Sequence, residues 1–126
     1  MIFNDPTILA EVREAFDAYE AALQRNDTGL LDAYFCHRED TVRYGVADLQ
    51  YGIDAIRSFR AGQAAFDRRL SQTVIVAYGT DFATASTLFH REDFPGQVGR
   101  QQQTWIRMEG GWRIAAAHVS MMAAEE

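Results

Sequence analysis

Large hydrophobic residues recur at spacings of three and four in the first quarter of the chain. This period matches the turn of a helix and predicts an amphipathic α-helix with one buried face. Asp5 is the expected N-cap, and Pro6 is the expected first helical residue. The buried stripe consists of Ile8, Val12, Phe16, Tyr19 and Leu23.

Shorter elements are expected in the middle of the chain. A second helix begins at Asp27 or Thr28, because either side chain can cap it. Residues 41–44 are rich in strand formers and are expected to pair with residues 49–51 as a hairpin. A third helix is predicted from Ile53 to Phe66.

After Arg69 the pattern changes to strand-forming segments separated by short turns. Short connections between successive strands favour antiparallel pairing. Helices followed by an antiparallel meander predict an α+β fold with the helices on one face of the sheet. A chain of 126 residues is long enough for a single domain, residues 1–126, with one core. The predicted strands are Ser71–Tyr78, Asp81–Arg91, Gly99–Glu109 and Gly111–Met121.

Two arginines flank one predicted apolar wall. Arg43 alternates with Val42 and Tyr44, so it points to the opposite face of their strand. Arg60 lies four residues after Ile56, beside the apolar face of the third helix. An arginine near apolar surface needs an anion, an acceptor or water, so we expect a pocket for a small anionic substrate. Solvent exposure of both arginines is the alternative.

Tyr19 and His118 are two further candidates. The hydroxyl of Tyr19, on the buried stripe, either meets backbone or water or hydrogen-bonds a substrate oxygen. His118 shares its strand parity with Trp112 and Ile114, which are expected in the core, so it is expected to face inward. A histidine satisfied within the core is the alternative for His118.

The strand 99–109 carries amides beside an aromatic ring. Gln101, Gln103 and Trp105 share one face, and the tryptophan favours that face as the inner one. Amides beside an aromatic side chain can line a polar pocket. We therefore expect Gln103 and Trp105 to contact substrate, together with Arg60 and His118.

Charge and composition exclude several classes of protein. The net charge of −6 argues against a nucleic-acid partner. No apolar run approaches the roughly 18 residues of a membrane helix. All 12 basic residues are arginine, and without lysine there is no Schiff-base chemistry. The N-terminus lacks a basic region before an apolar one, so we expect no signal peptide and a cytoplasmic location.

Familiar catalytic and metal motifs are missing from the sequence. Cys36 is the single cysteine, which excludes an internal disulfide and gives no metal-ligand spacing. The clusters that begin at His37 and His90 also lack the spacing of a metal site, so we expect no metal or cofactor. There is no G-x-S-x-G or glycine-rich phosphate loop, and no inward carboxylate stands out as a general base.

The order of the predicted elements, ending in a strand that begins GGWRI, resembles the nuclear transport factor 2-like, or SnoaL-like, superfamily. The resemblance implies a cone-shaped, curved antiparallel sheet wrapped around the N-terminal helices. It implies a pocket lined by the first and third helices and the concave face of the sheet. It also implies a homodimer, or a higher homo-oligomer, formed through the convex face.

Within that superfamily the chain resembles the AtzH-like family of small hydrolases, which is also associated with oxalurate catabolism. The segments that carry this resemblance are EAFDAYEAAL, TVRYG, YGIDAIRSFR, GRQQQTW and GWRIAAAHVS. The resemblance implies amide hydrolysis with decarboxylation of dicarboxyurea-type compounds from s-triazine breakdown. It assigns the site to Tyr19 and Arg43. Tyr44 departs from the small or aliphatic residue expected after the arginine, and at the pocket mouth it would change the substrate size.

The combined hypothesis is a metal-independent hydrolase of linear amide bonds. Arg43 and Arg60 would anchor a substrate carboxylate, Tyr19 would contact the reacting group, and Gln103 and His118 would orient the substrate. One alternative is a non-catalytic ligand-binding protein or an accessory subunit of an amidase. Another is an isomerase or dehydratase that uses His118 and Tyr19 as acid and base.

Overall fold

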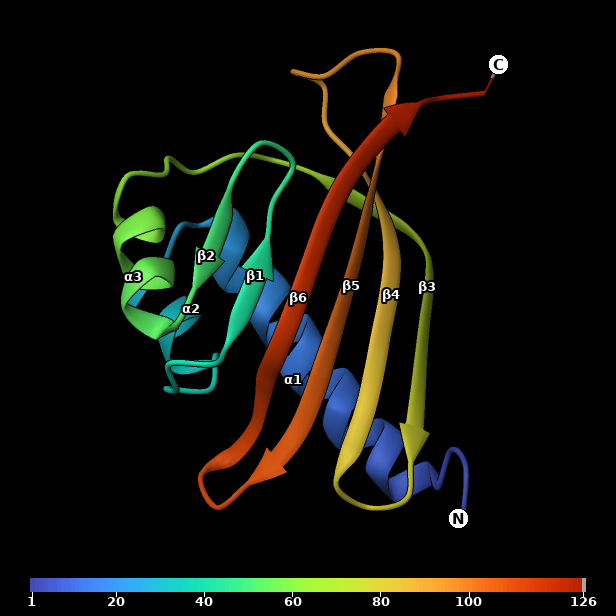
Figure 1. The fold of residues 1–126 in the computed structure, drawn as a ribbon. Helices are drawn as coiled ribbons and strands as arrows, with labels where there is room; N and C mark the ends of the chain where they lie inside the picture. The colour runs from blue at the N-terminus through green and yellow to red at the C-terminus, as the bar shows by residue number, and fades with distance from the viewer. Residues whose placement is uncertain (126) are drawn as a thin grey trace.

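The computed structural model describes residues 1–125, which form three helices and six strands (Figure 1). None of these helices is long and apolar enough to cross a membrane. In chain order the elements are α1 (Pro6–Gln24), α2 (Thr28–Ala33), β1 (Val42–Tyr44), β2 (Leu49–Tyr51), α3 (Ile53–Ala61), β3 (Arg69–Tyr78), β4 (Phe82–His90), β5 (Gln97–Met108) and β6 (Gly111–Ala123).

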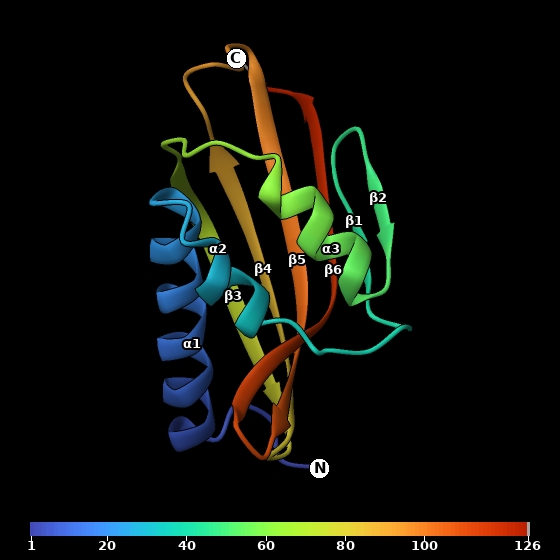
Figure 2. The same ribbon diagram turned by 90° about the vertical axis from the view of Figure 1, so that its left-hand side faces the viewer.

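All six strands form one curved sheet in the order β2-β1-β6-β5-β4-β3. Neighbouring strands are antiparallel, except that β1 runs parallel to β6. The three helices lie on the same face of this sheet (Figure 2). The predicted α+β fold, with a curved sheet around N-terminal helices, is confirmed. The hydrophobic core lies between the helices and this concave face.

Helix α1 forms as its sequence pattern predicts. The carboxylate of Asp5 accepts hydrogen bonds from the backbone N–H groups of Thr7 and Ile8, at 2.9 and 3.3 Å, which caps the helix before Pro6. The whole predicted stripe is buried, including Tyr19. The stripe therefore fixes the rotation of α1 and turns Tyr19 toward the sheet.

Helix α3 ends at Ala61, five residues before the predicted end at Phe66. Gly62 follows as the C-cap, and glycine is a poor helix former, so the last turn closes there. The segment 63–68 then crosses from α3 to β3 (Figure 1). This early end brings Phe66 and Arg68 against the space between the helices and the sheet.

A β-bulge in β6 reverses the predicted orientation of His118. Ile114 pairs with Trp105 and Ala116 pairs with Thr104, so Ala115 is an extra residue on β6. The inward side chains change there from even to odd positions. His118 therefore lies exposed on the outer face, with its ring 6.0 Å from that of Tyr44, and the expected inward orientation is wrong.

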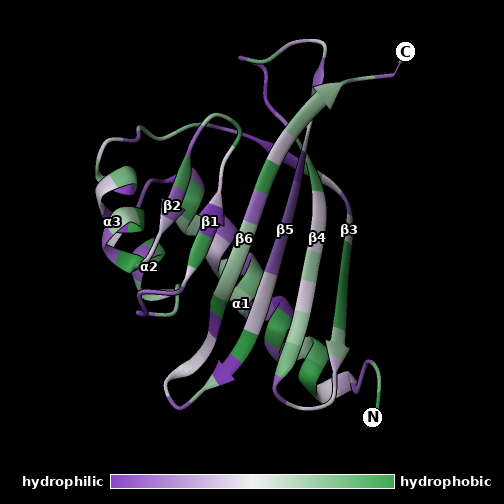
Figure 3. Ribbon diagram, in the orientation of Figure 1, coloured by the Kyte–Doolittle hydropathy of each residue, from purple (hydrophilic) through white to green (hydrophobic). Residues whose placement is uncertain are grey.

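Strand β5 carries polar residues into the interior. Figure 3 shows a hydrophilic stretch along β5 where the neighbouring strands are more apolar. Gln101 and Gln103 are buried on the concave face, on the same side as Trp105. The expectation that this set faces inward is confirmed, and it places two amides in the centre of the fold.

The close approach of β5 to Phe89 predicts the effect of adding one methyl group. A Cβ at position 99 would overlap the ring of Phe89, which is buried and packs against the guanidinium of Arg68 at 4.8 Å. We expect Gly99→Ala to lower the free energy of unfolding by about 1–3 kcal/mol, measured by urea unfolding. The control is Gly29→Ala at an exposed position of α2, which should be neutral or stabilising by up to about 1 kcal/mol. Equal stability of the two variants would contradict this packing.

Candidate functional site

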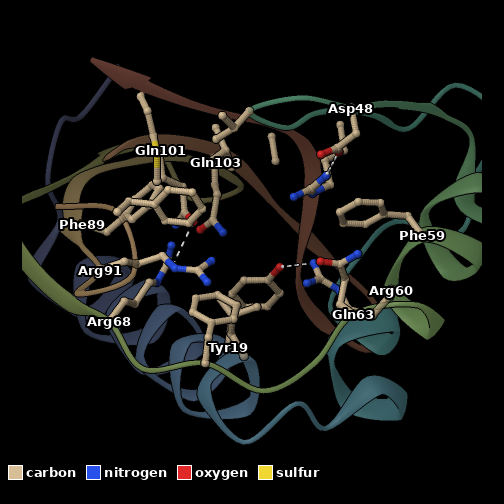
Figure 4. A pocket seen from close by; sticks show the side chains of 18 of the residues that line it. Tyr19, Asp48, Phe59, Arg60, Gln63, Arg68, Phe89, Arg91, Gln101 and Gln103 are labelled. Atoms are coloured by element: carbon tan, nitrogen blue, oxygen red, sulfur yellow. Dashed lines mark hydrogen bonds and ion pairs between the residues drawn. The ribbon is translucent and has the colours of Figure 1, made fainter. Parts of the chain in front are cut away.

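A cavity of about 170 Å³ lies between the concave face of the sheet and the helices (Figure 4). Aromatic rings and aliphatic side chains form much of its wall, and polar groups project into it from both ends. This combination is typical of a small-molecule site. The polar and charged residues that line it are Tyr19, Arg43, Asp48, Arg60, Gln63, Arg68, Arg91, Gln101 and Gln103.

Arg43 reaches one end of the cavity from β1. Its side chain is only 11% exposed, and its Nη1 donates to Asp48 Oδ1 at 2.7 Å and to Gln50 Oε1 at 2.8 Å. Gln50 lies directly opposite on β2, so the hairpin holds this group. The guanidinium lies 4.5 Å from the ring centre of Phe59. Arg43 is thus fixed in place with its charge close to the cavity.

Arg60 comes to the same end from α3 and is only 5% exposed. Its Nη2 donates to the hydroxyl oxygen of Tyr19 at 3.3 Å, and its buried Nε has no hydrogen-bond partner. Within residues 1–125 no carboxylate lies within salt-bridge distance of Arg60. A buried guanidinium without a counter-charge favours the binding of an anion.

The two arginines influence each other electrostatically. Burial lowers the pKa of Arg43 below its usual value, and the positive charge of Arg60 lowers it further. Arg43 remains charged at neutral pH, because an arginine pKa starts far above that range. Two cations therefore share one largely apolar site, and Asp48 can balance only one of them.

Tyr19 lies between the two ends of the cavity. Its ring packs edge-to-face against the rings of Tyr34, Phe35 and Trp105, with centroids 6.1, 6.1 and 6.4 Å away. Arginine can only donate, so the Tyr19 oxygen is the acceptor in its bond with Arg60. The phenolic proton is therefore free to be donated to a ligand in the cavity.

The other end of the cavity is built around Arg68. Its guanidinium makes two bonds to the carboxylate of Glu20, at 2.8 and 2.5 Å, and one to Gln101 Oε1 at 3.0 Å. Glu20 is the neighbour of Tyr19 on α1, and Arg68 follows the early end of α3. Unlike Arg60, this arginine has a buried carboxylate partner.

Comparison with known proteins identifies the family of the chain. The family model for AtzH-like proteins matches residues 1–125. The chain belongs to the AtzH-like family. No curated protein matches the chain.

Solved structures of similar proteins share the whole fold. A protein of unknown function from the DUF3225 family of Pectobacterium atrosepticum SCRI1043 is 50% identical, with a TM-score of 0.92, covering 96% of this chain and 95% of the other. A cystatin-like fold protein from Burkholderia xenovorans LB400 is 46% identical, with a TM-score of 0.96, covering 99% of both chains. A ketosteroid isomerase-like protein from Erwinia carotovora atroseptica SCRI1043 is 17% identical, with a TM-score of 0.77, covering 95% of this chain and 100% of the other. The last likeness shows the fold alone.

The structure of this AtzH-like chain brings together four of the six residues predicted for the site. Tyr19, Arg43, Arg60 and Gln103 line the cavity. Trp105 does not line it: the residue is fully buried, and its indole N–H donates to Gln103 Oε1 at 3.0 Å. The expected substrate contact of Trp105 is thus replaced by a contact that orients Gln103.

His118 cannot take part in this site from its position on β6. It lies on the opposite face of the sheet, as the bulge at Ala115 requires. Tyr44 also lies on that face, where its hydroxyl is 3.0 Å from that of Tyr51. Tyr44 stands where a small or aliphatic residue was expected, but it does not line the cavity and does not alter it directly.

Asp48 is the functional candidate that the sequence pattern missed. It lies in the turn between β1 and β2, where no periodicity indicates an orientation, yet it lines the cavity. Its Oδ1 accepts from Arg43 and from Gln50 Nε2, the latter at 2.9 Å, which leaves Oδ2 free of these bonds. A Cβ at position 45 would overlap this carboxylate, so the position needs a glycine. Gly45 was therefore the one sequence feature that could have indicated a side chain folded back over this turn. No inward carboxylate stands out in the sequence as a general base, and the structure adds Asp48 as one that lines the cavity.

The contrast between Arg60 and Arg68 predicts opposite effects of one substitution. Arg60→Met removes a buried charge without a counter-ion, so we expect the free energy of unfolding to stay the same or rise. Arg68→Met leaves Glu20 buried and unpaired, so we expect a loss of about 3–5 kcal/mol. Urea unfolding of both variants, without added ligand, measures the difference. Equal losses would contradict the assignment of Arg60 as the unbalanced charge.

Proposed function

We propose that this AtzH-like protein is an amidohydrolase that acts on a carboxylated urea-type compound, with loss of carbon dioxide. The resemblance to its family makes dicarboxyurea the model substrate. The observation that carries the proposal is the buried guanidinium of Arg60, which has no carboxylate partner and touches the hydroxyl of Tyr19. The unbalanced charge favours an anion at one end of the cavity, and the hydroxyl of Tyr19 lies beside it as a proton donor.

The substrate carboxylate would bind between Arg60 and Arg43. Arg60 offers its unpaired Nε–H, and charge-assisted hydrogen bonds to carboxylates are the strong ones in proteins. The mutual repulsion of the two guanidiniums would be relieved at the same time. The ring of Phe59 lies against both guanidiniums, at 4.5 and 5.9 Å, and keeps this end apolar.

Tyr19 would deliver the proton that decarboxylation requires. When an N-carboxylate loses carbon dioxide, the carbon–nitrogen bond breaks and its electron pair stays on nitrogen. The nitrogen then needs one proton, and the phenolic proton of Tyr19 is free because its oxygen already accepts from Arg60. Solvent would return the proton to Tyr19 afterwards.

Hydrolysis of the amide would use Asp48 in addition. Water adds across the carbon–nitrogen bond, so that its oxygen joins the carbonyl carbon and one hydrogen joins the leaving nitrogen. Oδ2 of Asp48 would accept the proton of the attacking water, and Tyr19 would protonate the nitrogen. The proposed reaction therefore needs only a correctly positioned substrate and proton transfer by Asp48 and Tyr19.

The isomerase alternative loses its basis in this geometry. It paired His118 with Tyr19 as acid and base, and the two side chains lie on opposite faces of the sheet. Two arginines in the cavity also disfavour a neutral, apolar substrate.

Ligand binding is the first test of the proposal. We expect dicarboxyurea-like acids, oxalurate or malonate to raise the melting temperature. At a ligand concentration a hundredfold above Kd, binding should add about 2.7 kcal/mol to the free energy of unfolding. A neutral steroid should have no effect. The shift should vanish in Arg43→Ala and Arg60→Met and persist in Arg57→Met, an exposed arginine of the same helix. A shift with the steroid alone would contradict the proposal.

Turnover is the second test, followed by release of carbon dioxide and ammonia. Tyr19→Phe keeps the ring packing and removes the proton, so we expect binding to persist and kcat to fall by about 10²–10⁴-fold. The control is Tyr34→Phe, whose ring contacts Tyr19 from outside the cavity and whose activity should stay near that of the wild type. Full activity in Tyr19→Phe would exclude its catalytic role. Binding without any turnover in the wild type would instead support an accessory subunit.

A further inference from the structure

The end of the cavity opposite Arg60 contains a buried amide donor without an acceptor. Arg68 Nη2 donates to Gln101 Oε1 at 3.0 Å, and an arginine nitrogen can only be a donor, so the NH₂ group of Gln101 must point elsewhere. That nitrogen, Nε2, is buried and has no hydrogen-bond partner within residues 1–125, and the residue lines the cavity. An unpaired buried donor is costly, so this end of the cavity favours a ligand that brings an acceptor.

A second glutamine on the same face of β5 is oriented in the same way. The indole N–H of Trp105 donates to Gln103 Oε1 at 3.0 Å, and an indole nitrogen can only donate. Gln103 is buried and lines the cavity, so its amide nitrogen is the polar atom left for a ligand. Figure 4 shows the side chains of Gln101 and Gln103 directed into the same space. Two amide donors therefore face that space.

Arg91 adds a positive charge at this end of the cavity (Figure 4). Its guanidinium lies 3.9 Å from the ring centre of Phe66 and 4.8 Å from that of Phe94. The carboxylate that pairs with it, on Asp93, is 57% exposed, whereas the side chain of Arg91 is 21% exposed. Water therefore screens the negative charge more than the positive one, and the cavity keeps part of the charge of Arg91.

The charges around the cavity match an anion that is negative at both ends. Two of the arginines that line it have carboxylate partners largely inside the fold, because Asp48 pairs with Arg43 and Glu20 with Arg68. The other two are Arg60, without a carboxylate partner in the described chain, and Arg91, whose partner lies in water. They lie at opposite ends of the cavity (Figure 4). Positive charge thus remains at each end.

We propose that Gln101, Gln103 and Arg91 form a second carboxylate subsite, so that the cavity holds a dianionic substrate by both ends. The inference rests on the proposed function and deepens it, because dicarboxyurea has a carboxylate at each end. One carboxylate lies at Arg60, as proposed above. The other accepts the two amide N–H groups and faces the guanidinium of Arg91. Its two oxygens have lone pairs enough for all of these donors.

Binding at both ends also places the reacting bond. Tyr19 lies between the two ends of the cavity, with its hydroxyl directed into the cavity (Figure 4). A substrate held by one carboxylate could still turn about that end, whereas a second anchor fixes the carbon–nitrogen bonds between the two carboxylates. The second subsite therefore contributes orientation as well as affinity.

Isothermal titration with paired ligands tests the second subsite. Malonate and succinate carry two carboxylates, whereas malonamate and succinamate carry one carboxylate and one neutral carboxamide. At a pH where all the carboxylates are ionised, we expect the dicarboxylate of the better-fitting pair to bind about tenfold more tightly, because its hydrogen bonds at the second subsite are charge-assisted. Two chain lengths ensure that the spacing of the two groups does not decide the result.

Gln101→Met tests the amide donor, because it keeps the length of the side chain and removes its N–H groups. Arg68 keeps both of its bonds to Glu20 in this variant. We expect the affinity for the dicarboxylate to fall about tenfold. The control is Gln102→Met, the same change on the exposed outer face of β5, which should leave the affinity unchanged. Gln101→Leu provides a second variant, and a melting curve for each verifies folding.

Arg91→Met tests the charge of the subsite. It removes the guanidinium and leaves an apolar side chain between Phe66 and Phe94. We expect the advantage of the dicarboxylate over the matching amide to fall from about tenfold to near unity. The control is Arg100→Met, which removes the same charge from the exposed outer face of β5 and should preserve that advantage.

The outcomes separate the inference from the proposed function. Dicarboxylates that bind no more tightly than the amides, or an unchanged dicarboxylate affinity in the folded variants of Gln101 and Arg91, overturn the second subsite and leave the hydrolase standing. A dicarboxylate preference that these variants lose, without turnover of dicarboxyurea by the wild type, supports the subsite and overturns the hydrolase. Failure of all four ligands to bind the wild type overturns the anion site and this inference with it.

Discussion

The positive charge of Arg60 is the constraint from which the rest of the site follows. A guanidinium taken out of water without a counter-charge is costly, by several kcal/mol per ion. The fold nevertheless buries it, through the apolar face of α3 that packs Ile56 into the core. Its side-chain hydrogen bond in the described chain is to the hydroxyl of Tyr19. Natural proteins keep such a cost where binding or catalysis requires it, because stability and function compete at the same residue.

Two irregularities in the backbone make the cavity around this charge. The end of α3 at Ala61, capped by Gly62, frees the next segment to carry Arg68 to Glu20, which anchors the far end of the cavity. The bulge at Ala115 turns β6 so that Ala117 faces the cavity, and bulges commonly occur where a sheet bends beside a site. The site therefore depends on local departures from regular structure as much as on the regular elements.

The sequence predicted what periodicity encodes. The stripe on α1 gave the burial of Tyr19. Alternation along the strands set Arg43 opposite Val42 and Tyr44, and it put Gln103 on the same face as Trp105. One extra residue in β6 inverts that alternation, and no residue pattern announces it, so His118 was misplaced. Asp48 lies in a turn without a period, and Glu20 pairs with an arginine 48 positions away. Such long-range pairings are set by the fold and cannot be read from local patterns.

The most direct measurement is the ¹⁵N–¹H NMR signal of the Arg60 Nε–H group during titration with malonate. That group is buried without a partner, so a bound carboxylate would accept its hydrogen bond and change its environment more than that of any exposed arginine. We predict a large, saturating shift of the Arg60 signal, with the signal of exposed Arg57 unchanged. An Arg60 signal that stays in place while ligand binds, or that moves no more than that of Arg57, would contradict the anion site.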